Sequence, residues 1–276
     1  MPRHSRAPET LALCVLALAL SSTAFAQRAG RTGRTSADWC ADADSRDGDG
    51  ATHCEVREAT MGAAGQTQID AGRNGGITLR GEDRGDAFVR ARVVGRGATS
   101  DDARRIAASV HVDTTGGVVK ADGPEQTENE SWVVSYEVSV PRNATVALTA
   151  NNGGIVIENF GGAATFHTKN GGLMLRDVSG DLHGDTTNGG VTVDLAGDRW
   201  EGAGLDVTTR NGGINIRIPE RYSAELEVGT THGRLNIGVP VTVQGTIGKS
   251  LTTVLGSGGA RIRAMTTNGG VSIRTR

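Results

Sequence analysis

The stretch Thr186-Thr187-Asn188-Gly189-Gly190-Val191-Thr192-Val193 contains the phrase that decides the fold, because near-copies of it recur along the chain. In each full copy a Thr stands two residues before Asn-Gly-Gly, and an apolar–polar–apolar triplet follows. Full copies are centred on Asn170, Asn188, Asn211 and Asn268, and a shorter one on Asn152. From Asn152 to Asn211 the intervals are 18, 18 and 23 residues. Repeats about 20 residues long predict a β-solenoid in which each repeat forms one coil.

The Asn-Gly-Gly phrase itself is typical of a tight turn between two strands. Asn and Gly adopt the left-handed backbone conformation more readily than other residues. Asn side chains stacked at one corner of successive coils can also bond to each other as a ladder. We therefore expect structural turn roles for Asn152, Gly153, Asn170, Gly171, Asn188, Gly189, Asn211, Gly212, Asn268 and Gly269.

Apolar and polar residues alternate on both sides of each turn, as in Val191-Thr192-Val193 and Ile214-Asn215-Ile216. A period of two with one apolar face predicts half-buried strands. The expected fold is all-β, a single-stranded parallel β-helix or β-solenoid with coils of about 18–23 residues. Antiparallel hairpin repeats are the alternative, since Asn-Gly between alternating strands also favours a hairpin. The nearly constant period favours the coil.

When the degenerate copies at Asn74, Thr115 and His232 are included, the three intervals 74–115, 115–152 and 232–268 are each about twice the length of a coil. We interpret each as two coils, with degenerate turns near residues 95–97, 123–124 and 248. On this interpretation the coils stack in the order of the sequence.

The amino terminus has the features of a secretory signal. Arg3 and Arg6 precede an apolar run over residues 11–20, and Ala24-Phe25-Ala26 provides a small–x–small cleavage site. That run is about half of what a bilayer span needs. The expected organisation is a signal peptide at 1–26, a flexible, disulfide-bearing segment at 27–64 and the repeat domain at 65–276. No transmembrane segment is expected in the mature chain.

Composition and cysteine usage limit the classes of partner. The formal net charge is −2 without any basic block, so nucleic acid is not an expected partner. Cys40 and Cys54 are the two cysteines that remain after the signal, and in an oxidising compartment they predict a disulfide. No Gly-x-Ser-x-Gly motif or phosphate-binding loop is found, and neither a cofactor nor a metal is expected.

The phrases Thr186-Thr187-Asn188-Gly189-Gly190-Val191-Thr192-Val193 and Thr266-Thr267-Asn268-Gly269-Gly270-Val271-Ser272-Ile273 resemble those of a bacterial putative-adhesin family of secreted β-strand-repeat proteins, a domain of unknown function. The resemblance covers about residues 65–276. It implies a β-helix-like fold and an exported protein of the periplasm, outer surface or extracellular space. It implies no catalytic residues.

One polar patch stands out on the outward positions of the expected strands. His167 and Asp185 fall at the same position of consecutive coils, with His183 two residues before Asp185. Asp206 and Glu227 also share an outward position in consecutive repeats, where two like charges could raise the pKa of one carboxyl. The full surface patch is His167, His183, Asp185, Asp206 and Glu227.

Two functions fit these features. The favoured one is a non-enzymatic, adhesin-like protein that contacts an envelope glycan or protein through regular polar faces, because repeat proteins present long surfaces without needing a pocket. The alternative is a carbohydrate-active enzyme of the polysaccharide lyase or glycoside hydrolase type, with the patch as its site. Few aromatic residues are available to stack on sugars, which weakens the enzyme hypothesis.

Overall fold

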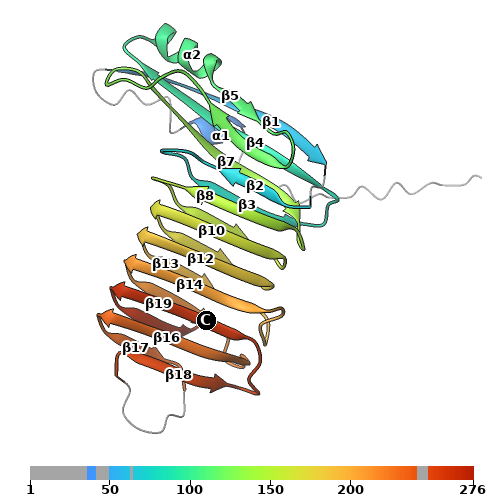
Figure 1. The fold of residues 1–276 in the computed structure, drawn as a ribbon, viewed down its shortest axis with the longest axis vertical. Coiled ribbons are helices and arrows are strands. Elements are labelled where there is room, and N and C mark those ends of the chain that lie inside the picture. Colours follow the sequence, from blue (N-terminus) through green and yellow to red (C-terminus); the bar gives the residue numbers. More distant parts are fainter. Residues whose placement is uncertain (1–35, 42–49, 63–64, 241–247) are drawn as a thin grey trace, which may run out of the picture. The chain divides into compact units, whose positions relative to one another are not determined.

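The computed structural model describes residues 36–41, 50–62, 65–240 and 248–276. The predicted signal peptide at 1–26 lies outside these ranges. Residues 34–276 form one compact unit built from two β-sheets, with two helices at its N-terminal end (Figure 1). None of the helices in the described ranges is both long and apolar enough to cross a bilayer.

Each sheet contains strands from both halves of the chain. The first sheet has the spatial order β1 (Ala51–Gly62), β4 (Asp86–Gly97), β7 (Ser131–Pro141), β3 (Ile77–Glu82), β9 (Ile155–Glu158), β11 (Leu173–Arg176), β13 (Val191–Asp194), β15 (Ile214–Ile218), β20 (Val271–Thr275) and β17 (Leu235–Gly238). The second sheet has the order β18 (Ser250–Leu255), β16 (Ala224–His232), β19 (Arg261–Asn268), β14 (Gly204–Asn211), β12 (Asp181–Asn188), β10 (Ala163–Asn170), β8 (Thr145–Ala150), β2 (Thr67–Asp70), β6 (Val118–Asp122) and β5 (His111–Asp113). The helices are α1 (Ser36–Cys40) and α2 (Ser100–Ser109).

The prediction of an all-β fold is confirmed, and the sheets are mixed. Strands β1, β4 and β7 pair antiparallel, as do β16 and β18, whereas the repeat strands pair parallel. The two strands that flank an Asn-Gly-Gly phrase do not form a hairpin. Strand β10 pairs with β8 and β12 in the second sheet, while β11 pairs with β9 and β13 in the first. The phrase thus carries the chain from one sheet to the other.

The order of the coils differs from the prediction. The last repeat, β19 and β20, lies between the repeat of β14 and β15 and that of β16 and β17. Its Asn268 aligns with Asn211 on one side and with His232 on the other, so the Asn-Gly-Gly phrase continues the existing corner there. The C-terminal strand is therefore an interior strand, and β17 and β18 form the edges at this end.

The expected Asn ladder is present. Each Asn Nδ2 donates to the Asn Oδ1 of the preceding coil at 2.7–3.0 Å, through Asn74, Asn152, Asn170, Asn188, Asn211 and Asn268. The reason for the glycines is different from the one predicted. The described non-glycine residues with positive φ, Asn159 and Asp177, lie at the opposite corner, and of the first glycines of the phrases at the Asn-Gly-Gly corner Gly269 alone has a positive φ, +158°. At the Asn-Gly-Gly corner a Cβ on Gly171 or Gly189 would lie 2.1 or 2.0 Å from a carbonyl oxygen of the adjacent coil.

A Thr two residues before five of the aligned corner residues lies on the buried face, as the alternation predicts, but the hydrogen bond of its hydroxyl was not predicted. Thr168, Thr186, Thr209, Thr230 and Thr266 face the interior and are at most 6% exposed. Each hydroxyl donates to a glycine carbonyl at the corner of a neighbouring coil, at 2.7–2.8 Å. These bonds satisfy backbone acceptors that would otherwise be buried without a partner.

One of the three expected degenerate turns lies in a coil. Residues 123–124 follow β6 and precede β7, and these two strands pair parallel with β2 and β3 of the adjacent coil. By contrast, residues 95–97 end β4 just before α2, and residue 248 precedes β18. Between β3 and β8 the chain forms the long antiparallel strands β4 and β7, the helix α2 and the short strands β5 and β6. Thr99 and Asp102 cap α2 reciprocally, which explains why a helix begins there. Between β17 and β19 lies β18, which runs antiparallel to β16.

The core lies between the two sheets and is continuous along the repeats. Strand positions that face inward are aliphatic, and one row is matched in size. Phe166 aligns with Gly184 in the next coil, and its ring occupies the space that a Gly184 side chain would need. The large Phe166 side chain beside a glycine keeps this part of the core close-packed.

The N-terminal segment is fastened to the first sheet. Cys40 and Cys54 form the predicted disulfide, which links α1 to β1. Trp39 is buried there, and the Arg90 guanidinium lies 5.2 Å from its ring centroid. The sequence places residues 27–64 outside the repeat domain, but β1 from this segment forms the edge of the first sheet.

Candidate functional site: the outer face of the second sheet

Polar side chains form straight rows across the outer face of the second sheet. Parallel, in-register pairing places equivalent residues of neighbouring coils about 4.8 Å apart. One row contains, in spatial order, Ala147, Thr165, His183, Asp206, Arg263 and Glu227. The next row contains Thr149, His167, Asp185 and Thr208. The fold itself therefore brings most of the predicted patch onto one surface.

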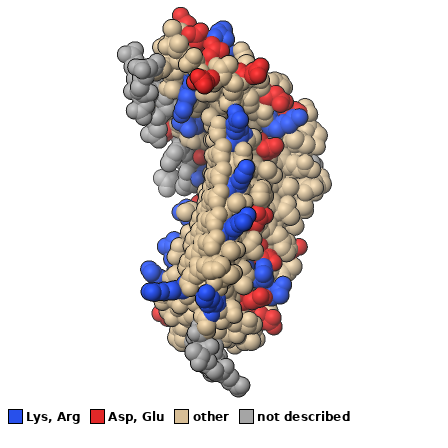
Figure 2. Space-filling model, turned by 60° about the vertical axis from the view of Figure 1, so that its left-hand side comes forward, with Lys and Arg blue, Asp and Glu red and all other residues tan. Residues whose placement is uncertain are grey.

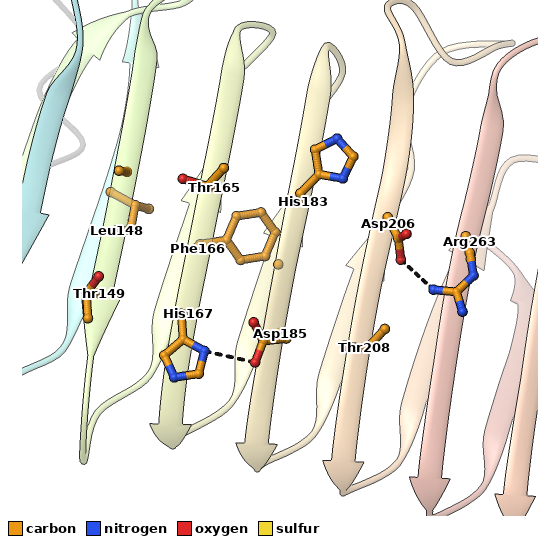
Figure 3. A pocket seen from close by; sticks show the side chains of 12 residues that line it. Leu148, Thr149, Thr165, Phe166, His167, His183, Asp185, Asp206, Thr208 and Arg263 are labelled. Carbon is orange, nitrogen blue, oxygen red and sulfur yellow. Dashed lines mark hydrogen bonds and ion pairs between the residues drawn. The ribbon is translucent and has the colours of Figure 1, made fainter.

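His167 and Asp185 are direct neighbours in adjacent strands. Nδ1 of His167 lies 2.8 Å from Oδ2 of Asp185, within hydrogen-bond distance (Figure 3). Both side chains are about half exposed, at 50% and 52%. The imidazole therefore has a fixed orientation and still presents its other nitrogen to solvent.

His183 does not join this pair. Its Nε2 lies 2.8 Å from Oδ1 of Asp181, two residues earlier on the same strand. Asp181 was not among the predicted residues, although its alternation with His183 and Asp185 places all three on one face. Two separate His–Asp pairs result. Among the described residues, no group of three or more His, Cys, Asp or Glu side chains is arranged to hold a metal ion.

The expected Asp206–Glu227 neighbour pair is wrong, because the inserted repeat places Arg263 between them. Arg263 Nη1 lies 2.8 Å from Asp206 Oδ1, and its Nε lies 3.4 Å from Glu227 Oε1. The hydrogen bond that Arg263 donates to Asp206 is the largest cause that raises the pKa of Arg263. Arg261 also reaches Glu227, at 3.4 Å. The two carboxylates thus contact cations and not each other.

A groove of about 420 Å³ lies on this surface, and residues of both rows line it. It is open to solvent, and its lining comes from β8, β10, β12, β14 and β19 (Figure 3). The hollow exists because small outward side chains, Ala147, Thr149 and Thr165, lie beside the longer His167 and His183. Its lining includes His167, Asp185, Asp206, Arg263 and threonine hydroxyls, which together offer hydrogen-bond donors and acceptors.

The model of the Toastrack DUF4097 family matches residues 137–274 of this chain. The matched region contains the groove and the Asn ladder from Asn152 to Asn268, whereas Asn74 lies before it. The chain belongs to this family.

Several solved structures are similar to this chain at low sequence identity. A putative cell adhesion protein from Clostridium sporogenes is 10% identical with a TM-score of 0.45, and the alignment covers 82% of this chain and 100% of that one. A putative adhesin from Bacteroides fragilis is 11% identical with a TM-score of 0.34, covering 80% and 97%. A putative lipid binding protein from Parabacteroides distasonis is 10% identical with a TM-score of 0.30, covering 81% and 96%. A comparison with curated proteins finds no significant match.

Proposed function

We propose that this protein is an exported, non-enzymatic, adhesin-like protein of the cell envelope or surface, which binds a macromolecule along the groove of the second sheet. The observation that carries the proposal is the groove itself. Its polar side chains repeat in register across β8, β10, β12, β14 and β19, and several are held by hydrogen bonds or ion pairs. A fixed array of donors and acceptors binds a ligand with little loss of side-chain entropy.

The charge arrangement favours recognition over cleavage of the ligand. Glycoside hydrolysis by two carboxyl groups needs one protonated acid and one ionised partner. Asp206 and Glu227 instead both form ion pairs with Arg263, which lies between them in the sheet. A polysaccharide-cleaving enzyme is the alternative, and analysis of the ligand after binding separates the two functions.

Export and the solenoid architecture belong to the same proposal. The Cys40–Cys54 disulfide is typical of proteins in oxidising compartments, which agrees with the signal predicted at 1–26. In the repeats each coil contributes one strand to each sheet, and we propose that this part works as a rigid β-solenoid that displays the groove.

A binding screen with matched variants tests the proposal. The purified protein is measured against envelope glycans, peptidoglycan fragments and host-matrix proteins. His167→Ala/Asp185→Ala removes a hydrogen-bonded pair from the groove, and we expect it to weaken binding about tenfold or more. Arg217→Ala/Asp194→Ala removes an ion pair from the first sheet, in which the Arg217 side chain is half exposed, and serves as control. Equal binding by both variants would contradict the assignment of the groove.

A further inference from the structure

A row of cations follows the Asn-Gly-Gly corner, next to the Asn ladder and outside the groove. Arg73, Lys169 and Arg210 each immediately precede a ladder Asn, and all three are exposed. The backbone bonds of this corner align Arg73 with Asn151, and the strand register aligns the rest of the row. Figure 2 turns this corner toward the viewer and shows Lys and Arg side chains along it. We call these three residues the corner cations.

The corner cations occur on alternate coils. In spatial order the row contains Arg73, Asn151, Lys169, Thr187, Arg210, Thr267 and Thr231. Two coil spacings separate successive cations, about 9.6 Å. At the far end Lys249 Nζ donates to the carbonyl of Thr231 at 2.7 Å, which places a further positive charge two coils beyond Arg210. Uncharged amide or hydroxyl side chains stand between the cations.

The corner cations make no ion pair with any described residue, unlike several arginines of the first sheet. On the first sheet Arg80 and Arg176 both pair with Glu158, and Arg217 pairs with Asp194. Near the corner, Asp185 is bonded to His167, and Asp70 accepts from the Gly72 amide. The cations therefore keep their charge available for a ligand.

We propose that the corner cations bind an acidic polysaccharide that carries one carboxylate per disaccharide. The length of one sugar unit in an extended chain is about equal to the spacing between adjacent coils. The length of a disaccharide therefore matches the two-coil distance between successive corner cations, about 9.6 Å. Each carboxylate then meets a cation, and each neutral sugar meets Asn151, Thr187 or Thr267. Exposed amides of the Asn ladder run beside this row and can bond to sugar hydroxyls.

The period of the cations argues against other anionic partners. A nucleic acid strand carries a phosphate on every nucleotide, and a lipid surface presents charge in two dimensions, so neither benefits from a one-dimensional row with a two-coil period. The inference rests on the proposed binding function and names its partner class. The corner row lies on the same outer face as the groove, since Lys169 follows His167 by two residues in β10, but none of the corner cations lines the groove. Variants of the two rows can therefore fail separately.

The test compares polymers that differ in charge period. Affinity of the purified protein is measured for hyaluronan oligosaccharides, in which charged and neutral sugars alternate, for polygalacturonate, which is charged on every sugar, and for neutral chitin oligosaccharides. Single-stranded DNA and phosphatidylglycerol vesicles represent the other anionic classes. We expect the alternating polymer to bind best and the neutral one not to bind measurably.

Three variants locate the binding. Arg73→Gln/Lys169→Gln/Arg210→Gln should weaken hyaluronan binding about tenfold, since exposed ion pairs contribute modestly and three are lost. Arg104→Gln/Arg199→Gln/Arg274→Gln removes the same charge from exposed sites elsewhere and should bind like the unchanged protein. Lys169→Thr/Thr187→Lys keeps the charge but breaks the period, and should weaken hyaluronan binding several-fold while leaving polygalacturonate binding unchanged.

Several outcomes would overturn the inference. One is unchanged hyaluronan binding by Lys169→Thr/Thr187→Lys, and another is an equal loss of hyaluronan binding in both triple variants. The others are no hyaluronan binding by the unchanged protein, or tighter binding of DNA or vesicles than of hyaluronan. Loss of hyaluronan binding in His167→Ala/Asp185→Ala but not in the corner triple variant would also overturn it, while supporting the groove as the binding surface.

Discussion

At the scale of single residues, the repeated phrase is explained by close approach between coils. The first glycine of each phrase lies so near a carbonyl of the adjacent coil that no side chain fits, and the Asn beside it bonds to its equivalents. The second glycine has more room. The two glycines of one phrase therefore carry different constraints, which the sequence pattern alone does not separate.

Substitution of neighbouring glycines tests this difference. Gly189→Ala places a Cβ 2.0 Å from the Gly171 oxygen, and overpacking against backbone should lower the free energy of unfolding by about 1–3 kcal/mol. Gly190→Ala meets its nearest atom at 3.4 Å and is the control, with an expected change within about 1 kcal/mol. Urea denaturation measures both. Equal destabilisation would contradict the close-approach explanation.

The inward threonines allow a second comparison at this scale. Thr186→Val keeps the shape but leaves the Gly171 carbonyl without its 2.8 Å bond, and should cost about 1–3 kcal/mol of stability. Thr208→Val, an outward position in the adjacent strand, should change stability by no more than about 0.5 kcal/mol. Thermal unfolding of the two variants checks this, and a neutral Thr186→Val would show that the buried bond contributes little.

At the scale of elements, the sequence predicts the repeat strands well and the region between β3 and β8 poorly. Strands such as β11, β13 and β15 follow directly from the apolar–polar–apolar triplets after Asn-Gly-Gly. The region between β3 and β8 carries only a degenerate phrase at Thr115-Gly116-Gly117, and its length was interpreted as degenerate coils, of which β6 and β7 form one. The capping box of Thr99 and Asp102 was the available signal for α2. The long strands β4 and β7 pair antiparallel although α2, β5 and β6 lie between them in the sequence. The period of the apolar residues does not reveal such a non-local pairing.

The cap of α2 gives a pH-dependent prediction. Hydrogen bonds from Thr99, and then from Arg105, lower the pKa of Asp102 from its ordinary value of 3.8. A depressed folded-state pKa adds stability that is fully present above the ordinary value and is lost as pH falls through the lowered one. The difference in melting temperature between the unchanged protein and Asp102→Asn should therefore be constant from pH 7 to about pH 5 and shrink below pH 4.

The neighbouring Asp101 provides the control for this experiment. Asp101 lies in the first turn of the same helix, its side chain is 92% exposed, and it forms an ion pair with Arg104. Asp101→Asn removes the same charge without touching the cap. A melting-temperature difference for Asp102→Asn that grows on acidification would contradict the sign of the linkage.

At the scale of the whole molecule, the order of the coils is what the sequence does not contain. Every repeat carries a similar phrase, so any repeat can in principle stack on any other. The chain places its last repeat inside the stack, and this single choice separates Asp206 from Glu227 by Arg263. The predicted carboxylate pair failed for that reason, whereas His167 and Asp185, in consecutive coils, were correctly placed side by side.

Truncation tests the inserted repeat. A chain that ends at residue 257 lacks β19 and β20, the neighbours that join β16 and β17 to the stack. Hydrogen–deuterium exchange should then show fast exchange in β16, β17 and β18, while β8 to β13 stay protected. A chain that ends at residue 220 lacks β16 to β20 and is the control, because it shows how the remaining stack exchanges when it ends at β14 and β15. Continued protection of β16 in the longer truncation would contradict the order described above.

The central functional claim is that the groove of the second sheet binds a macromolecule and does not cleave it. The most direct measurement is mass analysis of every glycan that the protein retains, before and after incubation with excess protein. We predict unchanged masses, together with retention that is lost in His167→Ala/Asp185→Ala and kept in Arg217→Ala/Asp194→Ala. Shortened glycans, produced by the unchanged protein and no longer produced by Asp206→Asn or Glu227→Gln, would contradict the claim and establish an enzyme.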